Sequence, residues 1–179
     1  MNTTVSKLEG RVEEMRRLFD ESFALALPDQ VTAPEPMLAI TLEGERFALR
    51  MLEIVGLALS KEKIVPVPSR VPELLGLTGI RGVVVPVFSL ARLLGFDSES
   101  GSALWLVFCG ERQSPIALAF AGMEKQFEVA SSEIFTREEV SGHRYVNATV
   151  CEDTALRGVI SIPSLVEYIK ARGAGKPRK

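Results

Sequence analysis

The apolar residues near the N-terminus follow a helical period. Between residues 5 and 27 they recur three and four positions apart, as on one face of an amphipathic helix: Val5, Leu8, Val12, Met15, Phe19 and Ala26. Pro28 ends this pattern, and residues 28–36 contain three prolines without an apolar period. We therefore predict an amphipathic helix over 1–27, followed by an extended, proline-rich linker over 28–36.

From residue 37 the pattern becomes typical of short strands separated by turns. Apolar residues at 37–41 and 47–49 flank Glu43, Gly44 and Glu45, which predicts a β-hairpin. The first half then continues with a helical turn or two at 51–55, a strand at 58–67, a brief helix at 72–75, a strand at 83–88 and a helix at 90–94. A polar loop at 96–102 precedes a second series of strands, at 103–109, 116–121, 123–129, 145–151 and 156–162. Pro163 favours the start of a closing helix over 163–172, and we expect a disordered tail over 173–179.

Many short strands in two comparable halves indicate a mainly β protein. We predict one small barrel from about residue 37 to 95 and a second from about 103 to 162, with the closing helix completing a domain over 37–172. No sequence repeat between the halves proves this division independently.

Composition and charge narrow the classes of partner. The 179 residues are 46% hydrophobic and 25% charged, with a formal net charge of −2, which is ordinary for a globular domain. Basic residues cluster only at 176–179, so we expect no nucleic-acid partner. The N-terminus lacks the pattern of a signal peptide and no long apolar run occurs, so we expect a cytoplasmic protein that does not insert into a membrane.

Residues suited to catalysis or to metal binding are sparse. Cys109 and Cys151 lie in apolar strand-like runs, which favours two free, buried thiols over a disulfide. His143, the single histidine, lies in a polar turn without a second ligand nearby in the sequence. No phosphate-binding glycine motif occurs. We therefore expect no cofactor, no metal and no enzymatic activity.

Arg81 is the most unusual residue of the chain, because it lies between two glycines, Gly79 and Gly82, just before an apolar strand. A guanidinium that enters an apolar layer is costly unless it is paired, and glycines allow close backbone approach or a positive φ. We expect Arg81 to organise a junction, to bind a partner, or both.

Several motifs occur in an order that resembles the CheW-like domain family, the coupling modules of bacterial chemotaxis arrays. They are GERFAL at 44–49, MLEIV at 51–55, IVPVP at 64–68, PELLG at 72–76 and LTGIRGVVVPVFSL at 77–90. The resemblance covers about residues 37–171. It implies two five-stranded, SH3-like barrels on a shared core. It also implies an adaptor that binds the cytoplasmic helical tip of a chemoreceptor and the regulatory domain of a CheA-type histidine kinase.

The resemblance also implies which residues contact these partners. The receptor surface would include Ile54, Val55, Leu57, Arg81, Gly82 and Val83, and the groove and kinase contact would include Trp105, Ile116, Leu118 and Gly122. Core packing is the competing interpretation for the apolar members, and it is favoured for Ile54, Val83 and Trp105.

The chain departs from the family pattern at several positions. Gly56 stands where the family often has an acidic residue that can pair with the arginine, which leaves Glu53 or backbone carbonyls as partners for Arg81. Ser89 and Ala121 likewise replace common acidic residues. The helix over 5–27 is an addition, and two interpretations stay open: it covers a barrel face, or it makes an extra contact with a partner or a second copy.

These departures keep two other functions open. The first is a CheW-like interaction module of a motility or developmental pathway, including a decoy that binds a kinase regulatory domain but no receptor. The second is a small-molecule-binding barrel or enzyme, which would require a polar-lined pocket.

Overall fold

The computed structural model describes residues 33–59, 64–97, 105–111, 114–136, 143–152 and 155–173. The predicted helix over 1–27, most of the linker and the tail beyond residue 173 lie outside these described residues.

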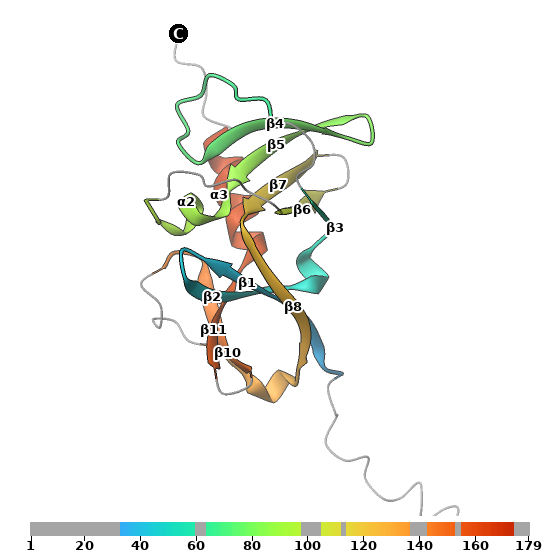
Figure 1. Ribbon diagram of the computed structural model, residues 1–179, viewed down its shortest axis with the longest axis vertical. Coiled ribbons are helices and arrows are strands. Elements are labelled where there is room, and N and C mark those ends of the chain that lie inside the picture. Colours follow the sequence, from blue (N-terminus) through green and yellow to red (C-terminus); the bar gives the residue numbers. More distant parts are fainter. Residues whose placement is uncertain are drawn as a thin grey trace, which may run out of the picture. The chain divides into compact units, whose positions relative to one another are not determined.

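The first sheet has six strands in the order β8–β1–β2–β11–β10–β9 (Figure 1). Their bounds are β1 Glu35–Leu42, β2 Glu45–Arg50, β8 Gly122–Val129, β9 Ile134–Thr136, β10 Val146–Glu152 and β11 Ala155–Ile160. Neighbouring strands are antiparallel except for β2 and β11, which run parallel. The predicted hairpin around Gly44 is the pair β1–β2.

The second sheet has five strands in the order β3–β6–β7–β5–β4. Their bounds are β3 Gly56–Leu59, β4 Leu74–Ile80, β5 Val83–Ser89, β6 Trp105–Glu111 and β7 Ser114–Phe120. Only β5 and β7 are parallel neighbours. The strand β7 lies in the centre of this sheet.

Four short helical elements complete the described chain: η1 Met51–Glu53, α2 Leu90–Leu94, η2 Ser131–Glu133 and α3 Ile162–Gly173. The hydroxyl of Ser89 accepts a hydrogen bond from the backbone N–H of Arg92 and so caps α2, while Gly95 ends this helix with φ +96°. The predicted helices at 90–94 and 163–172 therefore correspond to α2 and α3.

Alternating side chains of the strands build three apolar clusters. Met37 and Ala48 belong to a cluster of the first sheet with Val129, Val150 and Val159. A separate cluster belongs to the second sheet and contains Val85, Val87, Leu106, Ala117 and Ala119. The largest cluster joins the two sheets with α2 and α3, and includes Leu38, Ile40, Leu49, Phe88, Leu90, Leu118 and Leu165. The mainly β fold of two small sheets on a shared core is thus confirmed.

The sheets do not follow the predicted division of the chain into halves at 37–95 and 103–162. The first sheet takes β1 and β2 from the first half and β8 to β11 from the second, while β3 to β7 form the other sheet. One sheet also has six strands rather than five. The apolar period predicts which residues are strands, but pairing is set by contacts between segments far apart in the sequence.

One predicted element near residue 70 is wrong: the brief helix at 72–75 is instead a turn that leads into β4. Of the predicted strand at 58–67, Ala58 and Leu59 belong to β3, and residues 60–63 lie outside the described residues. Val65 forms an isolated bridge to Leu77. A Cβ added to Gly76, which has φ +151°, would lie 2.2 Å from the carbonyl oxygen of Val65. The close approach of these two segments therefore depends on glycine.

Candidate functional site

A groove of about 530 Å³ lies between β3 and the β4–β5 hairpin of the second sheet. It brings together four of the predicted partner-binding residues: Val55, Leu57, Arg81 and Val83. The other residues that line it are Gly56, Ala58, Ile80, Val85, Phe108 and Pro115. Segments some 25 residues apart in the sequence thus form one surface.

The wall from β3 is fixed by its pairing with β6. The backbone N–H of Val55 donates to the carbonyl of Phe108 at 2.8 Å, and Gly56 lies opposite Phe108 in the ladder. The side chain of Val55 is more than half exposed, as is that of Leu52 in η1 just before it. Ile54 is partly buried against the shared core, in agreement with the packing interpretation.

The wall from the β4–β5 hairpin ends in a two-residue turn. Arg81 and Gly82 connect Ile80 to Val83, which are paired across the hairpin. Both turn residues have positive φ, +50° and +80°, as the tight primed turns of hairpins require. The turn exposes Arg81, and Val83 beside it is 47% exposed.

Arg81 is therefore not the buried junction that its sequence context suggested. The residue is exposed at the tip of a hairpin, so the guanidinium is not buried in an apolar layer. Among the described residues Arg81 makes no ion pair. Glu53, its expected partner, instead accepts a hydrogen bond from the backbone N–H of Ile162 at 3.0 Å and lies 4.0 Å from the guanidinium of Arg50.

The residues expected at the kinase contact do not line this groove: Trp105, Ile116, Leu118 and Gly122. Leu118 is fully buried and Ile116 nearly so, because β7 is the central strand and both of its faces are covered. Trp105 is partly buried and packs against the shared core. A Cβ added to Gly122 would lie 2.9 Å from the carbonyl oxygen of Thr41, so this glycine allows β1 and β8 to approach. Expecting Ile116 and Leu118 at a partner surface was wrong.

Other groove residues were missed at the sequence level. Ile80, Phe108 and Pro115 line the groove, but their apolar strand positions predict only burial. The apolar period alone predicts neither which strands pair nor how a sheet curves. The sequence therefore gave no indication that these three residues share one surface.

The CheW-like domain model matches residues 36–170 of this chain. The chain belongs to the CheW-like domain family. Among solved structures, it is similar to the scaffolding protein TtCheW from Thermoanaerobacter tengcongensis, with a TM-score of 0.67 and 15% sequence identity. The similarity covers 75% of this chain and 93% of TtCheW, and at this identity it shows the fold. No curated protein matches the chain.

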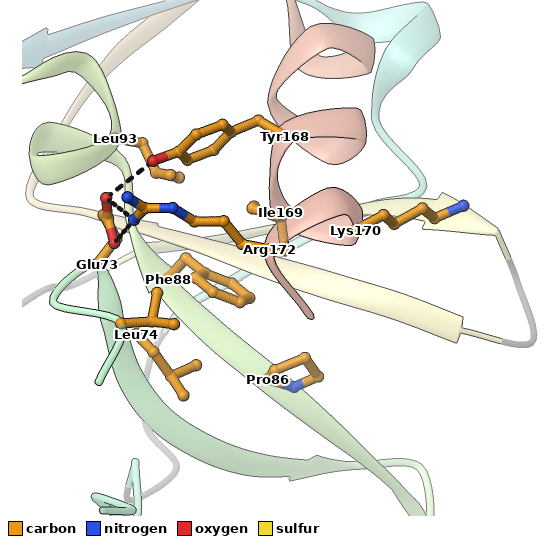
Figure 2. Close-up of a pocket in the computed structure, with 10 residues that line it drawn as sticks. Glu73, Leu74, Pro86, Phe88, Leu93, Tyr168, Ile169, Lys170 and Arg172 are labelled. Atoms are coloured by element: carbon orange, nitrogen blue, oxygen red, sulfur yellow. Dashed lines mark hydrogen bonds and ion pairs between the residues drawn. The ribbon is translucent and has the colours of Figure 1, made fainter. Parts of the chain in front are cut away.

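A second pocket of this CheW-like domain, of about 280 Å³, lies between α3 and the strands β4 and β5 (Figure 2). Apolar side chains, among them Phe88 and Ile169, line it. At its rim, Glu73 accepts hydrogen bonds from the hydroxyl of Tyr168 at 3.2 Å and from the guanidinium of Arg172 at 2.8 and 3.0 Å. Burial and the nearby Glu73 carboxylate raise the pKa of Tyr168. The rim charges are thus satisfied within the domain.

A cluster of charges lies within the first sheet of the CheW-like domain. The buried guanidinium of Arg157 donates to Glu152 at 2.5 Å and to Glu124 at 2.6 and 3.2 Å. Thr41 also donates to Glu124, and Lys125 lies 2.7 Å from Glu152. Hydrogen bonds from Arg157 and Thr41 lower the pKa of Glu124 to about 2. Such a permanently ionised, mutually paired cluster stabilises the sheet and offers no group for proton transfer near neutral pH.

The reactive side chains of the domain are held apart. Burial raises the pKa of Cys109 to about 12, so its thiol stays protonated and is a poor nucleophile. Cys151 is free as expected but exposed, since it lies on the outer face of β10, opposite the exposed Leu156. His143 contacts Glu45 at 2.8 Å and stacks on Phe96.

In the described part of the domain, no three His, Cys, Asp or Glu residues are grouped closely enough to hold a metal ion. None of the helices in that part has the length and apolar character needed to cross a bilayer.

Proposed function

We propose that this CheW-like protein is a non-enzymatic adaptor of chemotaxis-type signalling. It couples the cytoplasmic helical tip of a chemoreceptor to the regulatory domain of a CheA-type histidine kinase. The observation that carries the proposal is the groove that joins Val55, Leu57, Arg81 and Val83.

The groove has the character of a protein-binding surface. Its walls combine exposed apolar side chains with one cation, whereas Val85 and Phe108 form a more buried part of its lining. Apolar side chains that converge with a few polar groups favour docking of a partner segment. By contrast, the described residues offer no nucleophile beside a base, as a catalytic groove would require.

An adaptor transmits a signal only if its bound states differ in free energy with the state of the receptor. The two sheets of this domain share one core through Leu38, Leu118 and Leu165. Because packed cores resist deformation, a partner held at the second sheet is positioned firmly relative to a partner held on the first.

Binding of the full chain to two purified partners tests the proposal: a chemoreceptor cytoplasmic fragment and a CheA regulatory domain. We expect both to bind, and a ternary complex to form. Val83→Asp should weaken receptor binding at least about tenfold, since it replaces an apolar contact with a charged side chain that binding would have to remove from water. Val84→Asp is the matched control, because Val84 is 68% exposed but does not line the groove. Binding to neither partner would reject the proposed function.

One observation favours a second candidate, an interaction module that binds a kinase regulatory domain but no standard receptor. Gly56 lies in the groove where the family often has an acidic residue, so the groove differs in charge. Binding of the kinase domain without any receptor fragment would support this candidate.

A further inference from the structure

We infer that the pocket between α3 and the strands β4 and β5 binds an uncharged aromatic small molecule. This pocket is separate from the groove at Arg81, because no described residue lines both. The site goes beyond the proposed function and does not depend on it.

The pocket is enclosed by several elements rather than laid out along one surface. The turn before β4 contributes Val71, β5 contributes Phe88, α2 contributes Leu93 and α3 contributes Ile169. Phe88, Leu93 and Ile169 are buried, so the base of the pocket is packed and preformed. The volume of about 280 Å³ lies near the lower end of ligand pockets, roughly 300 Å³. A small molecule therefore suits it better than a peptide.

The lining favours an aromatic ligand. The surface inside the pocket is almost entirely apolar, and two aromatic rings line it from different elements, Phe88 from β5 and Tyr168 from α3 (Figure 2). Aromatic rings gain from offset or edge-to-face contacts with such side chains, in addition to the area that they bury. A rigid ring also loses less conformational freedom on binding than a flexible alkyl chain does.

The charges at the rim of the pocket neutralise one another, which favours an uncharged ligand. Glu73 accepts hydrogen bonds from Tyr168 and Arg172, and the guanidinium of Arg172 lies 5.0 Å from the centroid of the Tyr168 ring. Lys170 pairs with Glu111 at 2.6 Å and points away from Glu73 in Figure 2. A charged ligand would lose hydration in the apolar pocket and would meet no unpaired opposite charge among these residues.

The rim is held in place by the domain itself and can still accept one hydrogen bond. The backbone carbonyl of Glu73 accepts from the N–H of Ser89 at 2.8 Å, which fixes this residue beside β5. Among the described residues, only Arg172 donates to Oε2 of Glu73, at 3.0 Å. A carboxylate oxygen has two lone pairs, so Oε2 can accept a further hydrogen bond from an N–H or O–H group on the ring.

Titration of the isotope-labelled full chain with indole, followed by NMR, tests the inference. Indole is an uncharged double ring with one N–H donor. We expect saturable shifts of the amide signals at 71, 73, 74, 88, 93 and 168–172, with a Kd of about 1 mM or tighter for a ligand of this size. Indole-3-acetate and tryptamine carry the same ring with a negative or a positive charge, and should bind at least about fivefold more weakly.

A variant that fills the pocket provides the second arm. Val71 is half-buried, and its backbone N–H, rather than its side chain, donates to Oγ of Ser69 at 3.0 Å. Val71→Trp should weaken indole binding at least about tenfold, because the new ring occupies the space of the ligand. Val67→Trp is the matched control, a half-buried valine of the same segment that does not line the pocket, and should change binding less than about twofold.

Several outcomes would overturn the inference. These are shifts that do not saturate or that spread over the whole domain, equal binding of indole by Val71→Trp and wild type, and tighter binding of a charged analogue than of indole. The shift map of the wild type decides the question even if Val71→Trp fails to fold.

The same spectra separate this site from the proposed function. If a chemoreceptor fragment or the CheA regulatory domain shifts the pocket amides and indole does not, the pocket is a protein contact; the inference is then overturned while the proposed function stands. If indole binds as expected but neither protein does, the inference is supported and the proposed function fails.

Discussion

Glu53 and Ile162 are 109 residues apart in the sequence, yet they join the end of the first hairpin to the start of α3. The carboxylate of Glu53 accepts a hydrogen bond from the backbone N–H of Ile162 at 3.0 Å. This N–H belongs to the first turn of the helix, where no carbonyl of the helix itself can accept it. The hydroxyl of Ser161 supports the same helix start through Ser164. The side chain that was expected to neutralise Arg81 thus fixes the closing helix.

Replacing Glu53 tests this role. We expect Glu53→Ala to lower the free energy of unfolding by about 1 kcal/mol, because it removes the acceptor at the helix start. Glu53→Gln retains an oxygen at the same place and should cost less. Urea unfolding of the three proteins at neutral pH measures the difference. An alanine variant as stable as the wild type would show that the hydrogen bond contributes nothing.

The same residue predicts a dependence on pH. Burial raises the pKa of Glu53 above its ordinary value of 4.5, and the hydrogen bond from Ile162 opposes this only in part. The folded state therefore binds the proton more tightly than the unfolded chain does. The contribution of Glu53 to stability is fully present below pH 4.5 and declines as the pH rises through the raised pKa. Relative to wild type, Glu53→Gln should gain stability as the pH rises above 4.5.

Glu124 predicts the opposite dependence. Its pKa is lowered to about 2 by hydrogen bonds from Arg157 and Thr41, so its contribution is present above pH 4.5 and is lost as the pH falls towards about 2. Since 34% of its side chain is exposed, water screens the pair, and we expect Glu124→Gln to cost only about 2 kcal/mol at neutral pH. The difference from wild type should vanish near pH 2. Glu128→Gln, at an exposed position of the same strand, is the control and should change the free energy of unfolding at neutral pH by less than about 0.5 kcal/mol.

Gly76 and Gly79 form a matched pair within β4. A Cβ on Gly76 would lie 2.2 Å from the carbonyl oxygen of Val65, whereas one on Gly79 would meet nothing within 4 Å. Gly76 also has a positive φ, which strains any other residue. We expect Gly76→Ala to destabilise the protein by more than about 2 kcal/mol and Gly79→Ala to change it by less than about 0.5 kcal/mol. Similar melting temperatures for the two variants would contradict this account.

Elements set by residues close together in the sequence could be predicted, whereas contacts between distant segments could not. The helix α2 was predicted because its end signal, Gly95, lies next to it in the sequence. The parallel pair β2–β11 was not, because it places Ala48 beside Val159, and no local pattern connects two such residues. Apolar period predicts strands, whereas sheet membership depends on which strands together bury a common core.

The candidate site was predictable only in part for the same reason. The resemblance to the CheW-like family suggested Val55, Arg81 and Val83, and the structure brings these together at one groove. It also suggested Leu118, which lies on a central strand and is fully buried. A motif can specify which residues matter, but exposure depends on the neighbours that a strand acquires.

Stability and binding should separate at Arg81. Glycine suits a φ of +50° better than arginine does, so Arg81→Gly relieves strain in the folded state, although it also makes the unfolded chain more flexible. We expect the free energy of unfolding to stay equal or to rise by up to about 1 kcal/mol, while receptor binding falls. Urea unfolding and calorimetric titration on the same preparation measure both. If Arg81→Gly lost stability together with binding, Arg81 would support the hairpin rather than a partner. The arginine side chain would then stabilise the folded state by more than its strained backbone conformation costs.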